Sequence, residues 1–291
     1  MKRLPVLAAL YAVAVAAFPQ TEALTEVTSV STNLRYPDGL AWSRAGGYLV
    51  IADSAKKEVY RLDPGSPPKP THQNSNGVQG LAYDAQERLY FCEAASRRVT
   101  RLDKTNKIEI VADNYQGRKF NSPNDIVVRK DGHIFFTDPA FAGAADKREL
   151  DFNGIFHVTP KGEVELVAKW KTRPNGIALS PDGKILYVSD SDRRAVMAFD
   201  LDRNGVAANP RDVLTKIDGI PGGIRTDVRG NLYVAARGLS VYTPQGRKTR
   251  TLLTGEQTAN CAFGGDDLET LYISGRKSVF QIHLEVKGAL P

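Results

Sequence analysis

The sequence predicts an all-β fold, a six-bladed β-propeller built from four-stranded blades. Six segments of the chain align with one another at a period of about 45 residues. Each contains three short apolar runs joined by turns rich in Gly and Asp, and a further run such as IEIVAD or VELVAKW lies between segments. Four strands repeated six times is the arrangement of a propeller.

The aligned segments share their strand pattern, and most of them begin with Pro. A short apolar run is followed by a Gly or Asp turn, by a second run such as LYVSD, and by a third run ending near LD or FD. The β-branched and aromatic side chains in these runs favour strands over helices. The segments begin at Pro37, Val78, Pro123, Pro174, Pro221 and Ala259.

The last segment lacks its fourth strand. After the run SVFQIHL no further repeat follows, while EVTSVSTNL, residues 26–34, precedes the first repeat without a partner. We expect residues 26–34 to pair with residues 278–284 and to close the ring, because this pairing removes an exposed sheet edge. Cys92 then lies in blade two and Cys261 in blade six, with blade one between them. We therefore expect two buried free thiols instead of a disulfide.

The N-terminal residues 1–23 have the pattern of a secretory signal. Lys2 and Arg3 precede an apolar run with small residues near its end, which is consistent with cleavage after Ala17 or Ala23. The run is shorter than the roughly 20 residues of a membrane-spanning helix. The prediction is an exported protein, periplasmic or secreted, whose residues 24–291 form one propeller domain with no membrane contact after signal cleavage.

Charge and histidine placement limit the classes of function. The formal net charge is +6, but Lys and Arg are scattered and not clustered, which argues against nucleic-acid binding. The spacing of the histidines does not match a zinc site. They are His72, His133, His157 and His283.

Polar residues recur where the first strand of each blade begins. In a propeller these strands surround the central channel, so equivalent residues form a ring at one mouth. Desolvated polar groups cost a few kcal/mol each unless something satisfies them. Carboxylate and carboxamide oxygens suit a hard cation such as calcium. Alternatively, Asn and Asp simply form the turn that enters each strand. The predicted ring is Asp38, Gln79, Asn124, Asn175, Gly222 and Asn260.

A second set of carboxylates ends the second strands of four blades, at Asp53, Glu93, Asp138 and Asp190. These should lie at the same mouth. For Asp53 and Asp190 the simplest interpretation is that they accept hydrogen bonds from the following turn. Asp138 instead precedes Pro139 and a long insert, residues 140–153, which is a candidate substrate lid. Glu149 within the insert is a candidate substrate contact.

Several motifs together resemble the gluconolactonase and regucalcin family of six-bladed propellers. The resemblance covers essentially the whole mature chain and rests on FNSPNDIVVRKDGHIFFTDP, LDFNGIFHVTPKGEVELV, RPNGIALSPDGKILYVSDS, GNLYVAARGLSVYTPQG and NCAFGGDDLETLYIS. It implies a divalent metal in the channel mouth, usually calcium, with magnesium and manganese as alternatives. It also implies hydrolysis of sugar lactones or related esters.

The resemblance implies particular metal ligands. They are an acidic residue opening blade one, here Asp38 where Glu is commoner, the Asn of the PND element, Asn124, and the Asn of the PNG element, Asn175. The family's fourth ligand, an Asp in blade five, falls on Gly222. Either this residue is a lost ligand or its backbone requires glycine because φ is positive there.

Two functions remain open at this point. In the first, the protein hydrolyses a small-molecule lactone or ester. Asn124 and Asn175 hold metal and substrate, Asp38 supplies charge, and the base is hydroxide or an outer carboxylate, Asp138 or Glu149. In the second, it is a non-catalytic exported propeller that binds a sugar or a protein and has a degraded metal site.

Overall fold

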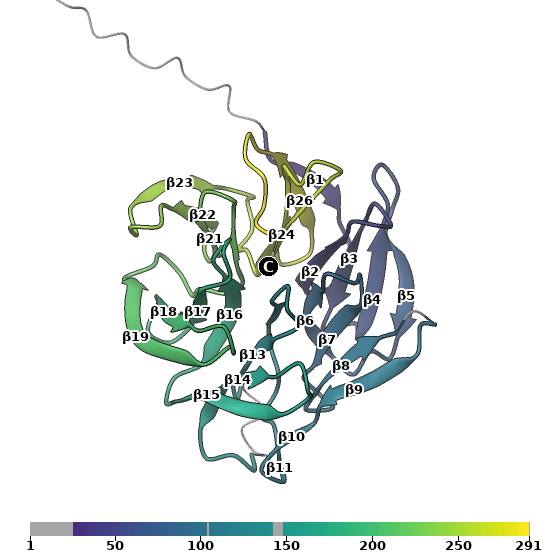
Figure 1. The fold of residues 1–291 in the computed structure, drawn as a ribbon. Coiled ribbons are helices and arrows are strands. Elements are labelled where there is room, and N and C mark those ends of the chain that lie inside the picture. Colours follow the sequence, from purple (N-terminus) through teal and green to yellow (C-terminus); the bar gives the residue numbers. More distant parts are fainter. Residues whose placement is uncertain (1–25, 104, 142–147, 291) are drawn as a thin grey trace, which may run out of the picture.

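The computed structural model describes residues 26–103, 105–141 and 148–290. In this part of the chain the regular elements are all strands, and they form a ring of six four-stranded antiparallel sheets (Figure 1). The predicted propeller is confirmed. The predicted signal, residues 1–23, lies outside the described residues and stays a prediction. No described helix is long and apolar enough to span a membrane.

The first three blades follow the aligned segments. Blade one contains β2 (Pro37–Ser43), β3 (Tyr48–Asp53), β4 (Glu58–Leu62) and β5 (Lys69–Gln73). Blade two contains β6 (Val78–Tyr83), β7 (Leu89–Glu93), β8 (Arg98–Leu102) and β9 (Ile108–Ala112). Blade three contains β12 (Ile126–Val128), β13 (Ile134–Asp138), β14 (Asn153–Val158) and β15 (Val164–Trp170). A hairpin that the repeat pattern did not predict precedes blade three, formed by β10 (Asn114–Tyr115) and β11 (Arg118–Lys119).

The remaining blades complete the ring. Blade four contains β16 (Pro174–Leu179), β17 (Ile185–Asp190), β18 (Ala195–Leu201) and β19 (Ala207–Leu214). Blade five contains β20 (Ile224–Thr226), β21 (Leu232–Ala235), β22 (Leu239–Tyr242) and β23 (Lys248–Leu252). Blade six contains β24 (Asn260–Gly264), β25 (Thr270–Ser274), β26 (Val279–His283) and, from the other end of the chain, β1 (Thr28–Ser31).

The closure of the ring is as predicted. β1 pairs antiparallel with β26, with Thr28 opposite Gln281 and Ser29 opposite Phe280. The strand that precedes the first repeat thus becomes the outer strand of the last blade. This pairing joins the N-terminal strand to the last repeat and covers an edge that would otherwise be open.

The core lies between blades and not within them. Each of the six clusters of buried apolar side chains joins two neighbouring blades, as Val99 of blade two and Phe136 of blade three do in one of them. Cys92 and Cys261 belong to different clusters and are buried free thiols, as predicted. Burial raises the pKa of the Cys261 thiol to about 12, so it is inert as a nucleophile near neutral pH.

The C-terminal segment runs back to the centre of the ring (Figure 1). The backbone N–H of Ala289 donates to the carbonyl of Thr226 at 2.9 Å, and that of Gly288 donates to the carbonyl of Leu268 at 2.9 Å. Thr226 ends β20, so the segment lies at the mouth of the channel opposite to the one where the first strands begin. The two mouths are therefore built differently.

Candidate metal centre at the channel mouth

Equivalent backbone hydrogen bonds identify the ring of residues at the mouth where the first strands begin, which we call the first mouth. The N–H groups of Asn124, Gly222 and Ala259 each donate at 2.8 Å to a carbonyl near the end of the second strand of the same blade. Ala259 therefore occupies the sixth position, and the prediction of Asn260 there is wrong by one residue. The error arose because blade six has Thr258 where most blades have the proline that marks the register. The corrected inner ring is Asp38, Gln79, Asn124, Asn175, Gly222 and Ala259.

Hydroxyl groups on the second strands fix the inner ring in place. Ser189 accepts the N–H of Gly176 in its own blade at 2.8 Å and donates to the carbonyl of Gly222 in the next blade at 2.6 Å. Thr137 and Ser274 make the same pair of contacts, so these side chains connect blades three to four, four to five and six to one. The ring residues are thus held by neighbouring blades as well as by their own.

The two predicted asparagine ligands are oriented by their amide nitrogens. Nδ2 of Asn124 donates to Oε1 of Gln79 at 2.5 Å, and Nδ2 of Asn175 donates to Oγ of Ser191 at 3.0 Å. Among the described residues, neither Oδ1 atom has a hydrogen-bond donor. Fixing the nitrogen of each amide leaves its oxygen as an acceptor, which is the ligand type that calcium prefers.

Asp38 supplies the carboxylate of the inner ring. In the described part of the chain no hydrogen bond or ion pair to its side chain is present, although its backbone carbonyl accepts the hydroxyl of Ser274 at 2.8 Å. Burial raises the pKa of Asp38 to about 7, and the negative charge of Asp125 contributes in the same direction. Such an environment disfavours an isolated carboxylate, and a cation beside Asp38 would stabilise it.

Gly222 is explained by a close approach between blades. Its φ is not in the left-handed region, so of the two alternatives the one that required a positive φ is wrong. A Cβ atom at this position would lie 2.4 Å from the carbonyl oxygen of Ala259. The backbone of blade six therefore occupies the space into which a side chain of blade five would extend, and the inner ring keeps one carboxylate.

The outer carboxylates are engaged in structural hydrogen bonds. Asp138 is fully buried, and its two oxygens accept the backbone N–H groups of Asn121 and Ser122 at 2.8 and 2.7 Å. Burial raises the pKa of Asp138 to about 7, whereas these two N–H groups lower it. Asp53 accepts backbone N–H groups in the same way, and Asp190 binds both backbone and side-chain donors. These residues fix the loops that enter and leave the strands.

Glu149 lies on the surface between blades two and three. It accepts Nη1 of Arg97 at 3.1 Å and the backbone N–H of Lys119 at 2.9 Å. The N–H of Lys119 is the main cause that lowers the pKa of Glu149. Residues 142–147 of the predicted lid lie outside the described residues, so its role over the channel stays a prediction.

One charged pair in the channel was missed by the sequence analysis. Asp125 and Arg225 lie one and three residues beyond the ring position of their blades, and Nη1 of Arg225 is 3.3 Å from Oδ2 of Asp125. A signal was present, because the other blades have Ala or Val where blade five has Arg225. Those residues are Ala41, Ala82, Val127, Ala178 and Ala262.

Two histidines that are distant in the sequence meet in the outer part of blade three. Nδ1 of His133 and Nε2 of His157 are 2.6 Å apart, and Nδ1 of His157 is 3.0 Å from Oε2 of Glu165. A Cβ on Gly205 would lie within 2.8 Å of both facing nitrogens. The absence of a side chain at Gly205 thus leaves room for the two facing imidazoles.

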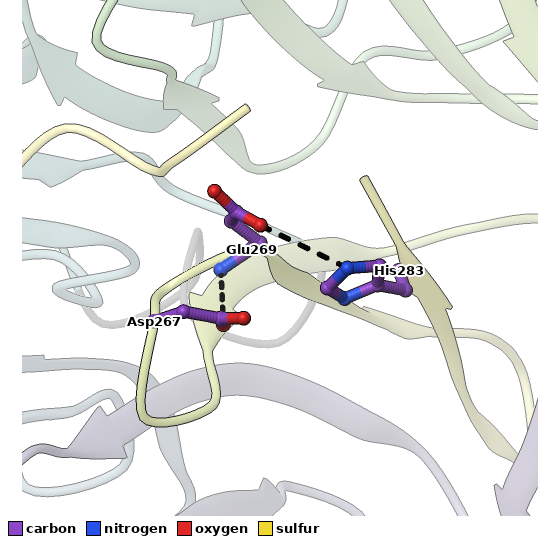
Figure 2. Close-up of side chains that lie close together, drawn as sticks. All are labelled: Asp267, Glu269 and His283. Atoms are coloured by element: carbon purple, nitrogen blue, oxygen red, sulfur yellow. Dashed lines mark hydrogen bonds and ion pairs between the residues drawn. The ribbon is translucent and has the colours of Figure 1, made fainter. Parts of the chain in front are cut away.

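A further group of possible ligands lies on blade six, where Figure 2 shows Asp267, Glu269 and His283 side by side. Oε2 of Glu269 lies 3.8 Å from Nε2 of His283, and the backbone N–H of Glu269 donates to Oδ1 of Asp267 at 2.9 Å. Asp267 and His283 are exposed, and the contacts within the group account for its arrangement. It is separate from the inner ring.

Comparison with known proteins agrees with this architecture. The model of the SMP-30/gluconolactonase/LRE-like region matches residues 36–276. A gluconolactonase of Zymomonas mobilis is 28% identical over 306 residues, which cover 93% of this chain and 85% of the relative. The structure of a gluconolactonase of Xanthomonas campestris has a TM-score of 0.83 at 28% identity and 89% coverage of each chain.

A more distant structure shows the same fold. The calcium-binding protein regucalcin of Agrobacterium tumefaciens has a TM-score of 0.77 at 22% identity, with 91% of this chain and 95% of that chain covered. The family match extends through the blades that carry Asp38, Asn124 and Asn175. The chain therefore belongs to the SMP-30/gluconolactonase/LRE-like family.

Proposed function

We propose that the protein is a metal-dependent hydrolase of sugar lactones or related esters. The observation that carries the proposal is the set of oxygen acceptors in the inner ring that have no donor among the described residues. These are Oδ1 of Asn124, Oδ1 of Asn175 and the carboxylate of Asp38. Similarity to gluconolactonases supports the choice of substrate class.

The donor set fits a hard divalent cation. Amide and carboxylate oxygens are the ligands of calcium, and a cation would satisfy acceptors that are otherwise costly to desolvate. Calcium is the ion we propose, with magnesium and manganese as alternatives. When bound, such an ion acts as a Lewis acid toward a carbonyl oxygen and lowers the pKa of water.

The protein's own residues would orient the substrate and the ion. Gln79 and Ser191 hold the two asparagine amides in place, so that their oxygens do not need to reorganise when the site is filled. No carboxylate is available at Gly222, and both oxygens of Asp138 are occupied by backbone N–H groups. Glu149 is bound to Arg97 and to the backbone N–H of Lys119. The attacking hydroxide would therefore come from solvent, and we expect the rate to increase with pH.

The proposal is tested with purified protein and gluconolactone as the substrate. Hydrolysis is measured before and after treatment with a chelator and after adding back calcium, magnesium or manganese, and calorimetry measures the affinity for each ion. Asn175→Ala should lose metal binding and activity together. Asn260→Ala is the matched control, because the structure places this carboxamide outside the inner ring, and it should retain the affinity of the parent.

A non-catalytic sugar- or protein-binding propeller is the second candidate. It is favoured by Gly222 and Ala259, which leave the inner ring with one carboxylate. Calcium binding without hydrolysis of any tested lactone would support this alternative. An absence of divalent-ion binding at millimolar concentration would refute the proposed metal centre.

A further inference from the structure

The channel contains a cavity of about 360 Å³ at the mouth opposite to the inner ring. Its walls are largely apolar and include Trp42, Tyr83 and Phe263 together with small side chains of the first strands. The C-terminal segment, through Gly288, Ala289 and Leu290, forms one side. We call this space the distal cavity. Its volume lies at the lower end of the range for small-molecule sites.

Arg225 lies at the boundary between the distal cavity and the inner ring. Its side chain is 19% exposed. Within the described residues it donates two hydrogen bonds, both from Nη1, to Oδ2 of Asp125 at 3.3 Å and to the carbonyl of Ile224 at 2.6 Å. In the described part of the chain, Nε and Nη2 of Arg225 have no acceptor. These two atoms form one edge of the guanidinium group, the edge that binds a carboxylate through two parallel hydrogen bonds.

The charges around the distal cavity favour an anion. Lys130 is in its lining and has no ion-pair partner within the described residues, and Arg44 is paired with Glu87. The carboxylate of Asp84, also in the lining, is bound to Arg88 at 2.6 Å and is buried. The unpaired charge that remains is therefore positive.

The ion pair with Asp125 does not by itself explain why blade five has an arginine at position 225. Buried pairs contribute little net stability, because desolvation offsets their attraction. Apolar residues at the equivalent positions of the other blades show that the fold tolerates a small side chain there. Arg225 also leaves N–H donors in a partly enclosed space, where they cost free energy without a partner.

We propose that the distal cavity binds a small organic monocarboxylate with a compact apolar body. The carboxylate accepts hydrogen bonds from Nε and Nη2 of Arg225, and the apolar body packs against the small side chains and the C-terminal segment. Lys130 increases affinity by charge at the rim. This site is independent of the proposed metal centre and of lactone hydrolysis.

Benzoate is a suitable probe, with benzamide as its uncharged counterpart. Binding is measured by calorimetry and by ligand-observed NMR on protein treated with a chelator, so that a metal ion at the inner ring cannot bind the carboxylate. We expect benzoate to bind and benzamide to bind at least about tenfold more weakly, since the charged hydrogen bonds are lost. Equal binding of the two probes would contradict a role for Arg225.

Variants locate the binding to the distal cavity. Ala82→Leu fills the space without changing charge, and Arg225→Lys retains a cation for Asp125 but removes the two-donor edge. Each should weaken benzoate binding by about tenfold or more. Asn175→Ala should leave it unchanged. The melting temperature of each variant shows whether it is folded. The proposal is overturned if folded Ala82→Leu and Arg225→Lys both bind benzoate as the parent does, or if Asn175→Ala abolishes binding.

Discussion

The two mouths of the central channel are formed by the same strands but have opposite chemistry. At one mouth, Asp38, Asn124 and Asn175 present oxygen atoms without hydrogen-bond donors among the described residues. At the other mouth, Arg225 presents N–H donors to an apolar cavity closed on one side by the C-terminal segment. One end is suited to a cation and the other to an anion.

The boundary between the two regions is narrow. Asp125 directly follows the ring residue Asn124. Its carboxylate contacts Arg225, which lies three residues beyond the ring residue of blade five. A shift of one or two residues along a first strand thus changes the chemistry of the channel. This difference shows that a repeat fold can keep its backbone constant while single side chains determine what each end binds.

The largest expected effect concerns charge at the first mouth. Asp38→Asn removes the carboxylate of the inner ring while retaining its shape. Calcium affinity should decrease by about a hundredfold, because affinity depends on the number of charged ligands. Calorimetry measures the change. Benzoate binding to the metal-free variant should match that of the parent, and a loss of both affinities would mean that the two mouths are not independent.

Gly222→Asp tests why the inner ring has a gap in blade five. The new Cβ would meet the carbonyl oxygen of Ala259 at 2.4 Å, so we expect the free energy of unfolding to decrease by about 2 kcal/mol. Gly222→Ala should show most of the same loss, since it adds the Cβ alone. Denaturant unfolding measures both variants. A stable Gly222→Asp protein with tighter calcium binding would show that blade six can move and that the position is a lost ligand.

Ser189→Ala tests how neighbouring blades hold the ring. The variant loses the hydroxyl between the N–H of Gly176 and the carbonyl of Gly222, which should lower the free energy of unfolding by about 1–2 kcal/mol. Ser66→Ala, in a surface turn, is the control and should be neutral. Thermal unfolding without metal compares them. Equal stability of the two variants would show that this contact does not tie blade four to blade five.

The smallest expected effect concerns the pH dependence of stability, to which the histidine pair in the outer part of blade three contributes separately from the channel. Burial lowers the pKa values of His133 and His157 below the ordinary 6.5, so the unfolded chain binds protons more readily than the folded one. Their contribution to stability is complete above pH 6.5 and decreases as the pH falls below it. The charged groups around the pair are Arg129, Asp131, Glu165 and Asp202.

His133→Gln should therefore make stability less dependent on pH between about 7 and 5, by less than about 1 kcal/mol. Urea unfolding at several pH values measures this change. His283→Gln, at an exposed position of β26, is the control and should retain most of the dependence of the parent. An unchanged pH dependence in His133→Gln would assign the acid sensitivity to other groups, such as the carboxyls of the channel.

The repeated sequence pattern determined the fold and part of the candidate site. Strand-length apolar runs with regular turns specify the blades, because strands and turns depend on the local pattern of residues. An unpaired strand at each end of the repeats specifies the closure of the ring, because an exposed sheet edge has to be paired. Asn124 and Asn175 were found in the same way. Each follows a proline that enters a first strand, which fixes the register from local residues.

Tertiary structure decided what depends on contacts between blades. The close approach of Ala259 to Gly222, the one-residue shift of Asn260 and the pairing of Asp125 with Arg225 join residues that are distant in the sequence. The contact between His133 and His157 likewise requires that residue 205, which is distant in the sequence, has no side chain. The repeat pattern specifies each blade, but distances of a few ångströms between blades follow from the packing of the whole ring, which no local pattern encodes.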